Sequence, residues 1–245
     1  MREKTTHSER SAAGVVARER TRVDPDAIPV IAERAERIED IDTAFRIERE
    51  VFEHSGYGQM PQEFDQQSTF YLARSAETGE VLGCIRMIDG DPMAAPMAHL
   101  PIAGEWIERF ASVAPGRVCE YGALAIPAAV QSDVGIAVSK ALYRAGWRHT
   151  AERGVELSGM IMEPRRARAM ARWHGLVFEQ AGPTTFYMGG DVATFVASPS
   201  DLLARLLELN PVFGAYVLDG FELDDLEIDL RDEPSPAPTR QPRSA

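Results

Sequence analysis

The stretch "VCEYGALAIP", residues 118 to 127, combines the pattern of a buried strand with one carboxylate, Glu120. Small and apolar residues fill the run, which stops at Pro127 because proline cannot donate a hydrogen bond to a neighbouring strand. An apolar pattern with helical spacing follows at 132–154, opening on a Ser-Asp cap and closing at Gly154. The sequence therefore predicts a buried strand that leads into a helix and carries an acid in its interior.

The same reasoning extends outward in both directions. Upstream, the patterns predict a strand at 28–35, a helix at 39–56, a hairpin of strands at 69–76 and 80–89, and a short helix at 105–113. Downstream, they predict a strand at 155–162, a helix at 163–175, short strands at 176–182 and 184–190, and an amphipathic helix at 198–210. This order predicts an α/β fold: a mixed, mostly antiparallel sheet with helices on both faces and the last helix packed over it.

Composition sets the domain organisation. The 245 residues are 44% hydrophobic, enough for the core of one domain, with two small domains as the alternative. We predict a flexible N-terminus at 1–26, a folded domain at 27–218, and an acidic, Pro-rich flexible tail at 219–245. Eight acids and one arginine at 219–233 supply much of the net charge of −12, which argues against a nucleic-acid-binding protein.

Several classes of protein and site are disfavoured by the same data. The N-terminus lacks the apolar core of a signal peptide and no stretch approaches 18 apolar residues, so we expect a cytoplasmic protein without an integral membrane segment. Cys84 and Cys119 are too few for a disulfide framework and lie in apolar runs, which indicates core thiols. The five histidines are scattered, so no metal site is predicted.

Four short motifs, in this order, carry a resemblance to a known family: "FRIEREVF" (45–52), "QEFD" (62–65), "GCIRMI" (83–88) and "CEYGALAI" (119–126). Together with the order of elements over 28–190, they resemble the GNAT acyltransferase superfamily, in the branch of acyl-homoserine lactone synthases and long-chain N-acyl amino acid synthases. The resemblance implies transfer of an acyl group from a thioester, on acyl carrier protein or coenzyme A, to an amine. No permanently bound cofactor is implied.

Matching positions in that branch imply three catalytic residues, Glu120, Arg86 and Asp65. The chain departs from the branch at three other positions, which hold Glu48, Gln62 and Ala123. These departures argue against homoserine lactone formation.

The resemblance also implies a region that holds the thioester donor. Backbone N–H groups around Leu124 to Ile126 are the expected oxyanion contacts, and the superfamily's pyrophosphate loop corresponds to "SDVGIA" (132–137), where Gly135 and Ala137 fit the pattern. Asp133 would repel a phosphate in that loop, so an acyl carrier protein is the favoured donor over coenzyme A.

Each implied catalytic residue also has a purely structural explanation. Glu120 is expected to take the proton of the attacking amine, and the alternatives are a solvent-facing carboxylate or a pair with Arg86. Arg86 is expected to orient a substrate carboxylate, and the alternative is an ion pair with Asp65 or Glu120. Asp65 alone is explained as a turn cap before residues 66–69.

Two further sets of residues are candidates. A proton for the leaving thiolate has three possible sources, Tyr121, Tyr143 and Tyr187, each of which is otherwise a packing residue. A dock for an acidic carrier protein is predicted from five arginines on two helices, Arg144, Arg148, Arg165, Arg168 and Arg172. The alternative for these arginines is a solvated helix face paired with Glu152 and Glu163.

The sequence thus favours an N-acyltransferase that moves a fatty acyl group to a small amine such as an amino acid. Two rivals remain: an acetyl-coenzyme A dependent N-acetyltransferase, and a non-catalytic binding module on the same fold. An open tunnel between the sheet and the last predicted helix would indicate a long acyl chain, whereas a filled core there would indicate acetyl.

Overall fold

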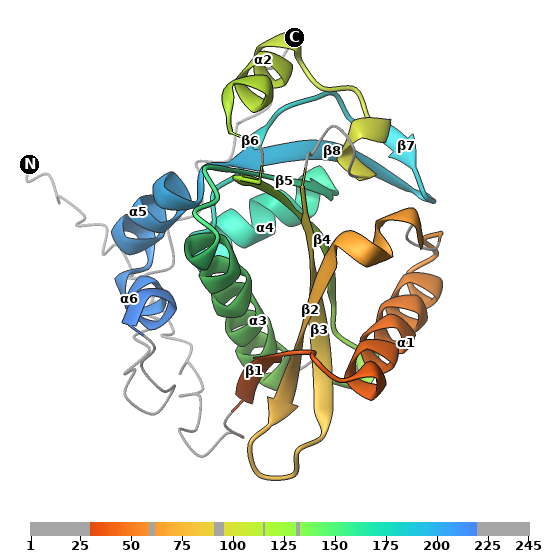
Figure 1. Ribbon diagram of the computed structural model, residues 1–245. Coiled ribbons are helices and arrows are strands. Elements are labelled where there is room, and N and C mark those ends of the chain that lie inside the picture. Colours follow the sequence, from red (N-terminus) through yellow and green to blue (C-terminus); the bar gives the residue numbers. More distant parts are fainter. Residues whose placement is uncertain (1–29, 59–61, 91–95, 115, 131–132, 220–245) are drawn as a thin grey trace, which may run out of the picture.

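One mixed sheet organises the chain (Figure 1). The computed structural model describes residues 30–58, 62–90, 96–114, 116–130 and 133–219. The strand order is β1-β2-β3-β4-β5-β8-β6, with β7 paired to β8, and β4–β5 is the parallel pair. The strands are β1 (Val30–Arg34), β2 (Ser68–Ser75), β3 (Val81–Asp89), β4 (Val118–Ala125), β5 (Leu157–Met162), β6 (Glu179–Gln180), β7 (Thr185–Tyr187) and β8 (Gly190–Ala197). The predicted α/β fold with a mixed, mostly antiparallel sheet is confirmed.

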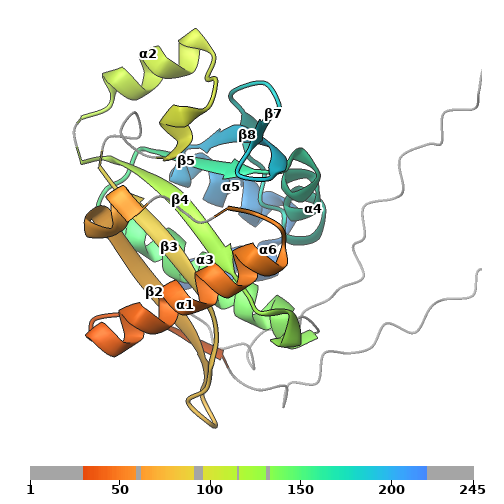
Figure 2. The same ribbon diagram turned by 90° about the vertical axis from the view of Figure 1, so that its right-hand side faces the viewer.

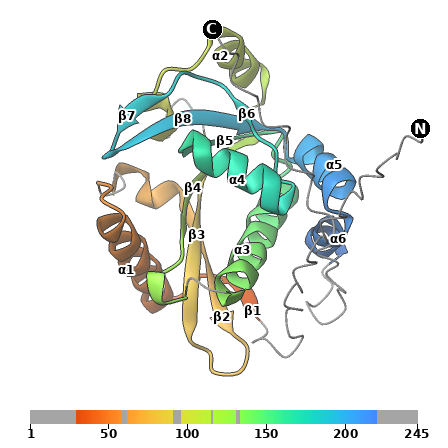
Figure 3. The same ribbon diagram turned by 180° about the vertical axis from the view of Figure 1, so that it is seen from behind.

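Helices cover both faces of the sheet. Alternation along the strands sends Cys84 and Val118 to one face and Ile85 and Cys119 to the other. The first face is covered by α1 (Ile38–His54) and α2 (Gly104–Ser112), and the second by α3 (Asp133–Glu152), α4 (Pro164–His174), α5 (Pro199–Leu209) and α6 (Pro211–Asp219). Figure 2 shows α1 lying across β3 and β4 with α3 behind them, and Figure 3 shows α4 in front of β5.

Local chemistry explains the limits of α4, the helix closest to the site described below. Pro164 occupies its first turn, where a missing N–H is harmless, and the preceding Glu163 is extended, as residues before proline are. The helix ends at Gly175, whose φ of 76° is easily adopted only by glycine. Both ends agree with the sequence prediction.

The structure differs from the sequence prediction after residue 175. Only Glu179–Gln180 of 176–182 is a strand, and the long strand β8 at Gly190–Ala197 was not predicted. Helix α6 was also not predicted, because its run of apolar residues has no polar face and so no helical period. α6 lies against α3 and α5, with Phe213 and Val217 in a shared cluster.

The predicted flexible segments 1–26 and 219–245 fall, apart from Asp219, outside the described residues. Within the described ranges, no helix combines the length and the apolar character needed to cross a bilayer.

Candidate active site

The central strands separate at one point, and the site is built around this separation. β4 and β5 pair only from Val118 with Leu157 to Tyr121 with Met160. Immediately beyond, the β3–β4 register shifts at Gly122, which forms a bulge. A Cβ at residue 122 would lie 2.8 Å from Ile88 Cδ1, so a larger residue would require the Ile88 side chain to shift. The bulge therefore turns β4 away from β5 at the position where the parallel pairing stops.

An apolar cavity of about 400 Å³ occupies this separation and continues beneath the C-terminal helices. Its walls come from β4, β5, the end of α1, the β7–β8 turn and helices α3 to α6. Leu202 and Leu206 of α5 and Val217 of α6 form part of the lining, so the cavity reaches the region between the sheet and the last helices. The cavity therefore lies between the sheet and the last predicted helix.

One wall of the cavity is held by contacts between distant segments. The N–H of Gly58, after α1, donates to the carbonyl oxygen of Met188 at 2.7 Å. Gly189, with φ 99°, approaches Gly56 so closely that a Cβ would lie 2.4 Å from its carbonyl oxygen. These contacts fix Tyr57 and the β7–β8 turn at the edge of the cavity.

The charged groups that line the cavity lie at the start of α4. Glu163, only 8% exposed, accepts hydrogen bonds from the Tyr57 hydroxyl and from Arg165 Nε. The hydrogen bond from Arg165 is the main reason that the pKa of Glu163 is below its ordinary value, so this carboxylate is ionised at neutral pH. Arg166 lines the cavity one helical turn from Glu163.

The inner part of the cavity is uncharged. His174 lines it, and desolvation, followed by the nearby Lys140, lowers the pKa of this imidazole to about 4. The predicted tyrosines Tyr121, Tyr143 and Tyr187 all line the cavity too, and burial raises the pKa of each.

Glu120 lies beside the cavity in a closed environment. It is 1% exposed, and its Oε2 accepts the N–H of Met97 at 3.0 Å. Its Oε1 is buried without a hydrogen-bond partner among the described residues. Burial raises the pKa of Glu120 to about 8, against a lowering by the Met97 hydrogen bond and by Arg86. Glu120 therefore neither faces solvent nor forms an ion pair with Arg86.

Glu120 is electrostatically connected to the cavity. The pKa of Tyr187 is raised first by desolvation and then by the charge of Glu120. Tyr187 thus lines the cavity and also lies within electrostatic range of Glu120.

Arg86 is the centre of a buried charge network. Its Nη2 lies 2.7 Å from Asp65 Oδ1, its Nη1 lies 3.3 Å from Glu48 Oε1, and its Nε donates to Ser68 Oγ at 2.8 Å. The side chain is 1% exposed, with its guanidinium over the ring of Phe70. Each nitrogen of Arg86 thus has a partner within the fold, and the predicted alternative of an ion pair with Asp65 is present in the structure.

Both acids of this network are explained by Arg86. Asp65 lies in the short 3₁₀ helix η1 (Gln62–Gln67) and lines a second cavity of about 600 Å³, which also includes Ser68. Glu48 is the single acid on the buried face of α1, and burial raises its pKa more than Arg86 lowers it. Glu48, one of the three residues at which the chain departs from the branch, is therefore the second ion-pair partner of Arg86.

The expected donor-binding residues are only partly brought together. Leu124 lines the cavity, whereas Ile126 and Ala137 pack into the core between α3 and the sheet. Gly135 lies in the first turn of α3, where a Cβ would lie 3.0 Å from the carbonyl oxygen of Val130. The close packing of Gly135 against Val130 explains this glycine without a phosphate.

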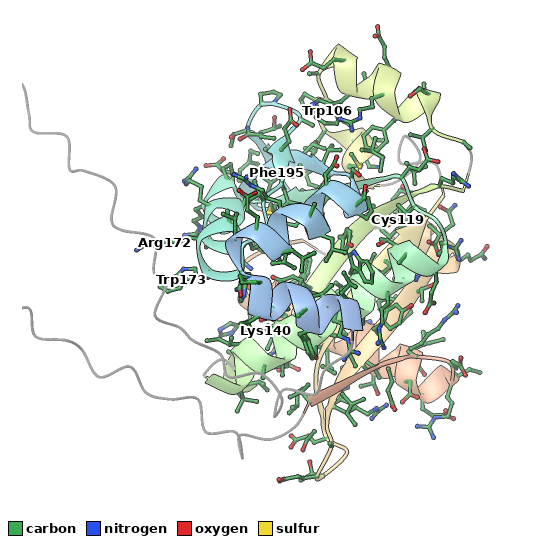
Figure 4. All side chains as sticks on the ribbon, turned by 90° about the vertical axis from the view of Figure 1, so that its left-hand side faces the viewer. Trp106, Cys119, Lys140, Arg172, Trp173 and Phe195 are labelled. Carbon is green, nitrogen blue, oxygen red and sulfur yellow. The ribbon has the colours of Figure 1, made fainter. Side chains whose placement is uncertain are left out.

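The arginines of the predicted dock differ in their surroundings. Arg165, Arg168 and Arg172 are exposed on α4, and Arg172 stacks on Trp173, which is 60% exposed (Figure 4). Arg148 is exposed on α3, whereas Arg144 is half-buried with its guanidinium over Tyr216. The predicted pair with Glu163 is made by Arg165. Arg144 therefore belongs to the contact between α3 and α6 rather than to an open surface.

The cysteines are core residues, and the described part of the chain offers no metal site. Cys84 and Cys119 are buried, and desolvation raises the pKa of both thiols, which confirms that they are core residues. Within the described ranges, no three His, Cys, Asp or Glu side chains are grouped so that they could hold a metal ion.

Sequence reasoning missed Tyr57, Glu163 and Arg166 as parts of one site. An acid between a buried strand and the proline of a following helix was visible as "MEPRR" at 162–166. Its meaning depends on the β4–β5 separation and on the contact of Tyr57 with Glu163, which are 106 residues apart.

Comparison with solved structures yields two informative likenesses. FeeM, an N-acyl amino acid synthase from uncultured soil microbes, has a TM-score of 0.57 and 17% identity over 73% of this chain and 95% of FeeM. The AHL synthase LasI has a TM-score of 0.56 and 14% identity over 74% of this chain and 96% of LasI. No protein-family model and no curated protein matches the sequence. The strand order, the parallel β4–β5 pair and these two likenesses show that the chain has the GNAT fold.

Proposed function

We propose that the protein is an N-acyltransferase that moves a fatty acyl group from a carrier-protein thioester to a small amine, such as an amino acid. The observation that carries this proposal is the apolar cavity that runs from the β4–β5 separation to α5 and α6. The fold shared with FeeM and LasI supports it. FeeM is an N-acyl amino acid synthase, and making an N-acyl product needs a place for an acyl chain.

The shape of the cavity favours a fatty acyl group over acetyl. An acetyl group would leave the part lined by Leu202, Leu206 and Val217 empty, and well-packed proteins contain few voids of that size. The rival function is that of an acetyl-coenzyme A dependent enzyme. Such an enzyme would need a phosphate-binding loop at 132–137, where Asp133 would repel a phosphate.

The proposed reaction is a direct transfer. The uncharged amine nitrogen attacks the thioester carbonyl carbon, a C–N bond forms, the C–S bond breaks, and the thiolate leaves with a proton from the surrounding medium. The backbone at Leu124, where β4 leaves β5, is the proposed oxyanion contact. Glu120 is the proposed final acceptor of the amine proton, which reaches it through water because Glu120 does not itself line the cavity.

The function is tested by mass spectrometry of lipid extracts from a host that overexpresses the protein. New N-acylated amines that are missing with Glu120→Gln would support acyl transfer and identify both substrates. Equal extracts, followed by no product from purified protein with acyl-carrier-protein thioesters and a panel of amines, would favour a non-catalytic binding module.

A larger side chain in the cavity should shorten the preferred acyl chain. The proposed change is Leu203→Phe, at a position of α5 that lines the cavity. Each methylene that no longer fits loses about 0.8 kcal/mol of burial, or about fourfold in kcat/KM. We expect long-chain thioesters to lose activity by this factor per excluded carbon, while short-chain thioesters keep it, in a kcat/KM series over donor length.

The matched control is Leu209→Phe, on the same helix but 47% exposed and not part of the cavity lining. An equal loss for all chain lengths with Leu203→Phe would contradict an acyl cavity, because it would indicate general damage.

Reversing the charge of exposed arginines on α4 should weaken binding of the carrier-protein donor. The proposed dock for an acidic carrier protein consists of Arg148, Arg165, Arg168 and Arg172. The double change Arg168→Glu and Arg172→Glu should raise the KM for the acyl carrier protein about tenfold at low salt and less at high salt. A donor that carries the acyl group on pantetheine alone should react unchanged. The charge-matched control is the double change Arg46→Glu and Arg49→Glu, at two exposed positions of α1. A similar loss of activity with the small donor would contradict docking.

A further inference from the structure

We propose that Glu163 and Arg166 hold the acceptor as a zwitterion, with Glu163 binding the ammonium and Arg166 the carboxylate of an α-amino acid. This inference rests on the proposed acyl transfer and names the residues that select its acceptor. It assigns to Arg166 the carboxylate-binding role predicted for Arg86, which is 1% exposed and pairs with Glu48 and Asp65.

The backbone places both side chains at one end of the cavity. Glu163 directly precedes α4 and is extended, with φ −66° and ψ 135°, because Pro164 follows it. The N–H of Arg166 donates to the carbonyl oxygen of Glu163 at 2.9 Å, which begins the helix. Residues three apart share a face of a helix, and both side chains line the cavity. The first turn of α4 therefore determines how far the Glu163 carboxylate lies from the Arg166 guanidinium.

Glu163 is prepared to bind a cation. The Tyr57 hydroxyl and Arg165 Nε donate to different carboxylate oxygens, which fixes the orientation of the group. An ionised carboxylate has about four acceptor positions, so these two hydrogen bonds leave room for an ammonium. Tyr57 and Tyr187 add aromatic walls at the same end. A small amine that enters here meets a negative, partly desolvated oxygen pair.

Arg166 supplies the complementary charge. It is exposed, and it makes no ion pair with any residue in the described ranges. Since His174 is neutral, Arg166 is the cationic side chain among the described residues that line the cavity. A guanidinium with free N–H groups binds a carboxylate through two parallel hydrogen bonds. A plain amine would leave Arg166 without a partner, whereas an α-amino acid satisfies both charges.

The two residues position the acceptor and do not carry out the proton transfer. The arrangement that keeps Glu163 ionised makes it a weak base, so the ammonium proton must pass to another group before the nitrogen attacks. The expected kinetic signature is therefore a change in the KM for the acceptor with little change in kcat.

The test compares amino acids with their decarboxylated amines, for example leucine with isoamylamine, with a dodecanoyl-carrier-protein thioester as donor. Arg166→Gln should raise the KM for leucine about tenfold to a hundredfold and leave that for isoamylamine unchanged, the range expected for one charge-assisted pair. Glu163→Gln should raise the KM for both acceptors. Arg49→Gln, which removes an exposed arginine of α1 outside the cavity, is the matched control.

The outcomes separate this inference from the proposed function. No N-acylation by the wild-type protein with any amine would overturn acyl transfer itself. Equal use of leucine and isoamylamine by the wild type, with acylation intact, would overturn only the zwitterion site. A raised KM for the carrier protein with Arg166→Gln, and an unchanged preference between acceptors, would assign Arg166 to the donor instead and also overturn the inference.

Discussion

Glu120→Gln reduces acyl transfer by a factor of about 10² to 10⁴ while the protein stays folded, the range expected when a general base is removed. Glutamine has nearly the same shape, and its amide oxygen still accepts the N–H of Met97, which now bonds to Glu120 Oε2 at 3.0 Å. The amide cannot take a proton from the amine. The measurement is single-turnover acylation by purified protein, with circular dichroism to establish that both proteins are folded.

The pH dependence of the rate gives a second view of the same carboxyl. A base works in its deprotonated form, and the pKa of Glu120 is about 8, so kcat/KM should rise with pH and level off above about 8. The inflection near pH 8 should be absent from the residual activity of Glu120→Gln, which should follow only the ionisation of the acceptor ammonium. A wild-type profile that is flat from pH 6 to 9 would contradict Glu120 as the proton acceptor.

The stability of the folded protein should fall as the pH rises, whereas the activity should increase. The folded-state pKa of Glu120 is raised above its ordinary value of 4.5, so the folded protein holds this proton more tightly than the unfolded chain does. Its contribution to stability is complete below about pH 4.5 and is lost as the pH rises to about 8, a loss on the order of 5 kcal/mol. Glu120→Gln cannot ionise, so at pH 9 it should unfold at higher urea than the wild type.

A variant that is less active and more stable at high pH distinguishes a functional carboxyl from a structural one. A structural carboxylate is normally paired, and its replacement destabilises the fold. If Glu120→Gln were less stable than the wild type at pH 9, Glu120 would have an unseen partner and its role as a base would be in doubt.

The fold was predictable where the sequence pattern is local. Strands β2 to β5 are short, largely apolar runs, and helices α1, α3, α4 and α5 have apolar residues at helical spacing, so each element has a local signal. Helix α6 is apolar throughout and β8 follows a turn at Met188 with a positive φ, so neither gives a clear local signal. Their positions depend on long-range packing, which periodicity does not report.

The candidate site was predictable only in part, for a related reason. The type and position of Glu120 stand out within one buried strand, and the structure shows the burial that raises its pKa. By contrast, the pairing of Arg86 with Glu48 and Asp65 joins three separate elements. From the sequence alone, Glu48 only indicates that a functional residue of the branch is missing. The structure shows that Glu48 is the ion-pair partner that allows Arg86 to be buried.

Arg86→Met should destabilise the protein by about 3 to 5 kcal/mol, because it leaves Glu48 buried without its cation. Asp65 contributes less to this loss, since about a third of its side chain is exposed and water can solvate it. The pKa of Glu48, already raised by burial, should rise further without Arg86, so the loss should grow with increasing pH. Urea unfolding at pH 6 and pH 8 measures both effects.

The double variant Arg86→Met with Glu48→Met separates the structural role of Arg86 from a catalytic one. Replacing both partners of a buried ion pair by apolar side chains of similar size is often neutral or stabilising, so we expect stability within about 1 kcal/mol of the wild type. Because every nitrogen of Arg86 is engaged within the fold, we also expect this variant to retain acyl transfer. Because Arg86 lowers the pKa of Glu120, activity is compared at a pH where Glu120 is ionised in both proteins. A stable double variant that has then lost at least a hundredfold in kcat/KM would return Arg86 to the residues needed for acyl transfer, since loss of folding could not explain the result.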